Sequence, residues 1–153
     1  MGLDRSKEDL SAVYRFRVLV KGLVTNRGDV LLLKKNEDKM DGGTWQMPGG
    51  HLEHDEALEE GMRRQIEAET GLSIETHQIV DALSFSDEED SVQILYHCEA
   101  EKRDQELKDN LEEIEWVPPQ KVGEKLNQQE SDMFRDRENL KNFLQKLEEL
   151  PSY

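Results

Sequence analysis

The chain lacks most of the features that mark secreted and membrane-spanning proteins. Its 153 residues include a single cysteine, Cys98, which cannot form an internal disulfide. No apolar run approaches the ~20 residues that a bilayer-spanning helix needs. The first residues also lack the apolar centre of a signal peptide. These absences predict a cytoplasmic protein that does not bind membranes.

Basic residues are scarce beside acidic ones. Lys and Arg number 20 against 35 Asp and Glu, which gives a net charge of −15. So negative a surface repels the phosphates of a long nucleic acid and the headgroups of anionic lipids. We therefore expect neither among the partners of this protein. Because net charge bears on solubility rather than on fold, a salt-adapted source would produce the same acidity.

Internal repeats, low-complexity tracts and Pro/Gly/Ser-rich linkers are also missing, which predicts one domain over residues 1–153. Residues 1–12 form a charged lead-in segment. The apolar patterns predict strands over 15–25, 30–34, 73–85, 92–100 and 113–117 and helices over 55–70 and 131–150. Residues 26–29 form a turn signal that joins the first two strands as a hairpin. This order favours an α/β fold in which helices cover a mixed sheet.

The helix predicted over 55–70 has the clearest boundaries. Leu58, Met62 and Ile66 fall on one of its faces. Asp55 is a residue type that caps helix starts, and Gly71 suits the left-handed conformation that ends helices.

A glycine-rich segment, residues 42–50, leads into this helix. Positions 65, 68 and 69 are three and four residues apart and share one helical face. Three carboxylates there would bind Mg²⁺, a hard cation that is held by oxygen ligands and bridges to substrate phosphates. Only Glu69 is acidic at these positions, since Gln65 and Ala68 occupy the other two.

The spacing resembles the Nudix box, G-x5-E-x7-R-E-U-x-E-E-x-G-U, where U is a bulky aliphatic residue. The matching positions are Gly50, Glu56, Arg64, Ile66, Glu69, Gly71 and Leu72. Trp45-x-x-Pro48-Gly49-Gly50 and Trp116-Val117-Pro118 are similar to the segments that flank the box in this family. The resemblance covers roughly residues 15–127. It implies an α/β/α sandwich with a mixed β-sheet and hydrolysis of a nucleoside diphosphate linked to another group. It also implies a requirement for Mg²⁺ or Mn²⁺.

Three departures from the family pattern affect the metal site. Gln65 replaces a glutamate that serves the family as metal ligand or as the base that activates water. Ala68 replaces another ligand, and Asn110 stands where the family often has an acidic residue. What the resemblance carries over is Glu69 as a metal ligand, the Gly49 carbonyl as a second and Asn110 as a neutral oxygen ligand.

The resemblance also implies that Glu56 and Arg64 brace the loop against the helix, although an ordinary surface ion pair would have the same sequence. The base remains open, with Glu112 preferred. The alternatives are Glu53, His51, His54 and Glu113, whereas His77 and His97 lie in strand-like runs where a sheet-face role is expected. Lys34 and Lys35 end a strand where family members often direct a basic residue toward the phosphates, and a solvated edge explains them equally well.

Two functional hypotheses follow. The box is similar to that of the GDP-mannose mannosyl hydrolase branch, in which water attacks the sugar carbon. Leu111 stands where that branch has its histidine base, so the mechanism does not transfer whole. The first hypothesis is a hydrolase of a small nucleotide, either a nucleotide sugar or a nucleoside triphosphate. The second is a Nudix-fold module that binds nucleotides with little or no turnover. The apolar tail helix would allow a homodimer.

Overall fold

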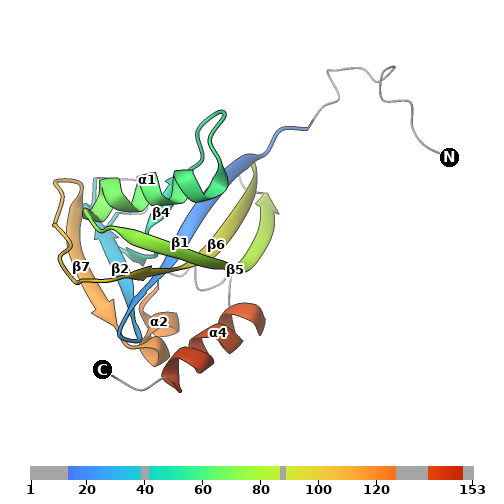
Figure 1. Cartoon of the computed structure of the whole chain (residues 1–153). Coiled ribbons are helices and arrows are strands. Elements are labelled where there is room, and N and C mark those ends of the chain that lie inside the picture. Colours follow the sequence, from blue (N-terminus) through green and yellow to red (C-terminus); the bar gives the residue numbers. More distant parts are fainter. Residues whose placement is uncertain (1–13, 39–41, 87–88, 127–137, 150–153) are drawn as a thin grey trace, which may run out of the picture.

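A computed structural model describes residues 14–38, 42–86, 89–126 and 138–149. Its elements are β1 (Arg17–Asn26), β2 (Asp29–Lys35), β3 (Trp45–Gln46), β4 (Gly49–His51), α1 (Leu58–Thr70), β5 (Ile74–Ser86), β6 (Asp90–Ala100), β7 (Leu111–Val117), α2 (Pro119–Lys125) and α4 (Glu138–Glu148). Figure 1 shows α1 on one face of the sheet and α2 and α4 on the other. The predicted α/β class with a mixed, helix-covered sheet is confirmed.

The two strands of the first hairpin separate soon after their turn. β1 and β2 pair only at Thr25↔Val30 and Asn26↔Asp29. Farther along, β3 pairs with β2 and β4 pairs with β1, both antiparallel. β7 takes the other edge of β2, and β6 runs parallel to β1. The glycine-rich segment is therefore held between two diverging strands, in the middle of the sheet.

The core has two parts, one on each face of the sheet, because side chains alternate along a strand. In β2, Leu31 and Leu33 pack in the cluster on the α1 side with Met62 and Ile66. Val30 and Leu32 pack in the opposite cluster, which includes residues of α2 and α4. All four β2 side chains are fully buried. This double burial explains why β2 is an almost continuous apolar run.

One end of α1 differs from the sequence-based prediction. The helix begins at Leu58 after Ala57, which makes no side-chain capping hydrogen bond. Asp55 instead lies in the preceding turn with a φ of 61°, so its predicted role as the cap is wrong. The prediction for the other end is confirmed, because Gly71 has a φ of 74° and its N–H donates to the Glu67 carbonyl.

Other element boundaries also differ from the sequence-based predictions. β7 begins at Leu111, two residues before the predicted start, and α2 was not predicted. The sequence signal for α2 was Pro119 at the first helical position. Because Pro118 and Pro119 are adjacent, they were interpreted only as the end of the preceding strand. The lead-in 1–12 and residues 131–137 and 150 of the predicted tail helix lie outside the described residues. Within the described ranges, every helix is too short or too polar to cross a membrane.

Candidate active site

The segment before α1 is fastened to β1 by backbone and side-chain hydrogen bonds. The Gly22 N–H donates to the Pro48 carbonyl at 2.9 Å. The buried Lys21 ammonium donates to the Met47 carbonyl at 3.1 Å. A Cβ at Gly49, whose φ is 139°, would lie 2.1 Å from the Val20 carbonyl oxygen. Only glycine fits this close approach between two backbones.

Glu69 reaches this segment from the last turn of α1. Its Oε1 accepts a hydrogen bond from the Gly49 N–H at 2.8 Å. The side chain is buried even though it carries a carboxylate, and burial of a charge requires such partners. The structure therefore brings together two of the three residues expected at the metal, Glu69 and Gly49.

Glu56 and Arg64 form a two-pronged ion pair near the start of α1. Arg64 Nε donates to Glu56 Oε2 at 2.6 Å and Arg64 Nη2 to Oε1 at 2.9 Å. The Glu53 N–H donates to the same carboxylate at 3.0 Å. These hydrogen bonds, first those from Arg64 and then that from Glu53, lower the pKa of Glu56 to about 2. The Glu56 hydrogen bond in turn raises the pKa of Arg64.

Gln65 and its neighbour Arg64 both contact the end of β4. Gln65 Nε2 donates to the His51 carbonyl at 3.1 Å, and Arg64 Nη2 donates to that oxygen at 3.2 Å. The Gln65 amide also lies against Gly50, where an added Cβ would come within 2.9 Å of it. Ala68 is exposed.

The two loop histidines have different surroundings. The His51 ring lies 3.3 Å from Arg17 Nη1, measured at Nε2. Burial and the Arg17 charge lower the pKa of His51, which favours its neutral form. His54 is almost fully exposed and faces Asp55 at 3.4 Å. Of these two histidines, His51 is the one that contacts a side chain of another element, Arg17 of β1.

Asn110 and Glu112 lie at the start of β7. The Asn110 carbonyl accepts a hydrogen bond from the Asn36 N–H at 3.1 Å. Glu112 and Glu113 lie 4.0 and 3.8 Å from the Lys34 ammonium. Lys34 therefore faces two carboxylates, with which any substrate phosphate would compete for it.

A cleft of about 460 Å³ runs along this edge of the sheet. Its lining residues are Trp45, Gln105, Leu107, Glu112, Glu113, Ile114 and Glu115. The Lys125 ammonium stacks on the Trp45 ring, 4.3 Å from its centroid, and pairs with Glu115. Sequence reasoning did not single out Lys125, because α2 itself was missed. It also missed Lys21, whose signal was a lone charge inside an apolar strand.

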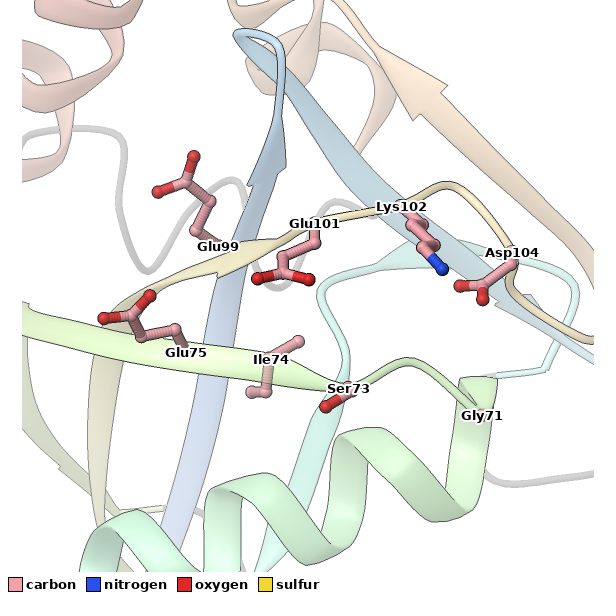
Figure 2. A pocket seen from close by; sticks show the side chains of 8 residues that line it. All are labelled: Gly71, Ser73, Ile74, Glu75, Glu99, Glu101, Lys102 and Asp104. Carbon is pink, nitrogen blue, oxygen red and sulfur yellow. The ribbon is translucent and has the colours of Figure 1, made fainter.

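A second cleft, of about 320 Å³, lies past the C-terminal end of α1 (Figure 2). It is lined by Gly71, Ser73, Ile74, Glu75, Glu99, Glu101, Lys102 and Asp104. Four carboxylates against one ammonium group repel phosphate. This cleft is therefore a poor site for a nucleotide.

The Glu69 carboxylate and the Gly49 carbonyl offer oxygen atoms, which are the ligands that a hard divalent cation takes. These protein ligands are few. In the part of the chain that the structure describes, no three His, Cys, Asp or Glu side chains are grouped closely enough to hold a metal ion. This donor set therefore fits an ion that keeps much of its coordination sphere for water and substrate phosphates, as Mg²⁺ commonly does.

Comparisons with known proteins agree with this geometry. The NUDIX domain family matches residues 14–140. A MutT-like protein from Streptomyces ambofaciens is 28% identical over 109 residues, which cover 71% of this chain and 68% of that protein. The nucleoside triphosphatase NudI from Escherichia coli O81 (strain ED1a) is 28% identical over 120 residues, covering 69% of this chain and 84% of NudI. A solved structure of a MutT protein from Methanosarcina mazei Go1 aligns with a TM-score of 0.71 at 28% identity, covering 82% of this chain and 96% of that one.

Proposed function

Because the chain belongs to the Nudix family, we propose that it is a divalent-metal-dependent hydrolase of a small nucleoside diphosphate derivative. The observation that carries this proposal is the Glu69–Gly49 contact, which directs a buried carboxylate to the glycine-rich segment. The Glu56–Arg64 pair supports it, since Arg64 also donates to the carbonyl of His51, the last residue of β4.

In this proposal Mg²⁺ or Mn²⁺ would be held by Glu69, the Gly49 carbonyl and the Asn110 side chain. The ion would neutralise charge on the substrate phosphates. One carboxylate cannot balance a divalent charge, so the phosphates themselves must supply much of the affinity. Glu112 is the proposed proton acceptor, with His51, which contacts Arg17, as the alternative.

Two substrate classes remain within this proposal. The relative named as a nucleoside triphosphatase favours nucleoside triphosphates. Gln65 and Ala68 favour nucleotide sugars instead. Attack of water at phosphorus needs a general base, and loss of that base typically costs about 10²–10⁴-fold in rate. Attack at the sugar carbon of a nucleotide sugar needs the base less, because the diphosphate is a stabilised leaving group.

The test is turnover of a nucleotide panel with Mg²⁺ or Mn²⁺ at low and high salt. The panel contains nucleoside triphosphates, ADP-ribose, dinucleotides and GDP- and UDP-sugars. Glu69→Gln should abolish turnover, whereas Glu67→Gln, which removes an exposed carboxylate from the same helix, should preserve it. Equal activity of both variants would refute the assignment of Glu69, and the preferred substrate identifies the bond that is cut.

A second candidate function is nucleotide binding without useful turnover, which Gln65 and Ala68 favour. The double variant Gln65→Glu/Ala68→Glu discriminates between the two. A gain of roughly 10²-fold or more in attack at phosphorus would mean that the natural site is disabled for that chemistry. Metal-dependent nucleotide binding with no turnover by the natural protein would establish the binding module.

A further inference from the structure

Two peptide units of the segment before α1 bridge the sheet and the helix, with opposite polarity. In the Pro48–Gly49 unit, the carbonyl accepts from Gly22 of β1 and the N–H donates to Glu69 of α1. In the His51–Leu52 unit, the N–H donates to the Val18 carbonyl at 2.9 Å and the carbonyl accepts from α1. Each end of β4 is therefore fixed on both sides by protein groups.

The His51 carbonyl accepts two hydrogen bonds from α1, donated from the adjacent positions Arg64 and Gln65. A glutamate at position 65 has no hydrogen to donate when ionised, and its charge would be repelled by the carbonyl oxygen. A divalent cation between the two oxygens would remove that repulsion, because hard cations bind carboxylate and carbonyl oxygens alike. The amide of Gln65 makes the contact directly.

We propose that Gln65 is a positioning residue that fastens the Gly49–His51 segment to α1 without a divalent ion. The segment then has its final conformation before any metal or nucleotide arrives. A metal ion would serve binding or chemistry in this protein, and it would not be needed to order the loop. This inference goes beyond the proposed function and concerns the conformation of the loop, so it holds or fails whether or not the protein hydrolyses nucleotides.

The test is hydrogen–deuterium exchange at the Leu52 amide, with and without Mg²⁺ and without nucleotide. This amide belongs to the peptide unit whose carbonyl Gln65 holds, and no turnover is needed. In the natural protein, exchange should be slow and unaffected by Mg²⁺. Gln65→Met keeps the length of the side chain and removes its donor, so exchange should be about three- to tenfold faster with or without Mg²⁺. Gln65→Glu should exchange equally fast without the ion and slow down when it is added.

Ala68→Glu is the matched control, since it adds one negative charge to the same helix at an exposed position that makes no contact with the His51 carbonyl. Without Mg²⁺ it should leave Leu52 exchange unchanged. The proposal is overturned if Gln65→Met exchanges as slowly as the natural protein. It is equally overturned if Mg²⁺ slows Leu52 exchange in the natural protein as much as in Gln65→Glu. The first measurement on the natural protein requires no variant, and the nucleotide panel tests the proposed function separately.

Discussion

Glu56 shows how a single side chain makes stability depend on pH. Its carboxylate accepts two hydrogen bonds from Arg64 and one from the Glu53 backbone. These contacts lower its pKa from 4.5 in a free side chain to about 2 in the folded protein. The folded state therefore gains stability from ionised Glu56, fully above pH 4.5, and loses it as the pH falls toward 2.

We expect Glu56→Gln to remove this component of acid destabilisation. Between pH 4.5 and 2 the unfolding temperature of the natural protein should fall more steeply than that of the variant. Thermal denaturation across that range measures the difference, with Glu60→Gln, which removes an exposed carboxylate of α1, as the control. Identical slopes for the natural protein and Glu56→Gln would show that the ion pair does not contribute.

Gly49 is a residue that the fold leaves little freedom to change. An alanine there would adopt a φ of 139° and place its Cβ 2.1 Å from a backbone oxygen of β1. Gly49→Ala should cost about 2 kcal/mol or more of unfolding free energy. Gly123 is the control, because a Cβ there meets nothing within 4 Å and helix interiors favour alanine over glycine by about 0.5–1 kcal/mol. Urea denaturation compares the two variants. A loss for Gly49→Ala no larger than a few tenths of a kcal/mol would contradict the backbone geometry.

At the scale of elements, α4 closes the core on the face opposite α1 (Figure 1). Leu140 and Leu147 are buried there, and the Phe143 ring packs against His97 with centroids 4.7 Å apart. His97 also hydrogen bonds to the Thr25 hydroxyl. The predicted sheet-face role of His97 is confirmed, and burial lowers its pKa to about 4.

We expect Leu140→Ala to destabilise the protein by about 2–5 kcal/mol, because it leaves a cavity between α4 and the sheet. Lys141→Ala, an exposed change in the next position, should alter stability by less than about 0.5 kcal/mol. Chemical denaturation of the two variants measures the contrast. Equal stabilities would mean that α4 does not contribute to the core in solution.

At the scale of the whole molecule, the net charge of −15 opposes the compact state. The acidic cleft in Figure 2 concentrates this repulsion where β5 begins and β6 ends. Raising the ionic strength from 0.1 to 1 M shortens the screening length from about 10 Å to about 3 Å. The unfolding temperature should therefore rise with added NaCl.

The double variant Glu101→Gln/Asp104→Asn tests the origin of this salt dependence. Both side chains are exposed and line the acidic cleft. The variant should unfold at a higher temperature than the natural protein in low salt and gain less from added salt. A salt response as large as that of the natural protein would assign the effect to charges elsewhere.

Most of the helices and strands could be predicted from the sequence, because the patterns that specify them lie within a few residues of one another. The apolar runs of β1 and β2, the stripe of α1 and the glycine at its end each depend on neighbours within a few residues. The predictions failed where residues distant in the sequence determine the local conformation. Asp55 does not cap α1, because the turn before the helix is arranged around Glu56, which Arg64 holds in place.

The sequence by itself determined the family, the α/β class and the positions of Gly49, Glu56, Arg64 and Glu69 along the chain, since a motif is a matter of spacing. Only the tertiary structure decided what Gln65 does. An amide at this position signals a lost carboxylate in the sequence, whereas in the fold it donates to the His51 carbonyl. The physical reason is that a hydrogen bond needs its acceptor in place, and β4 brings this acceptor to α1 only when it pairs with β1.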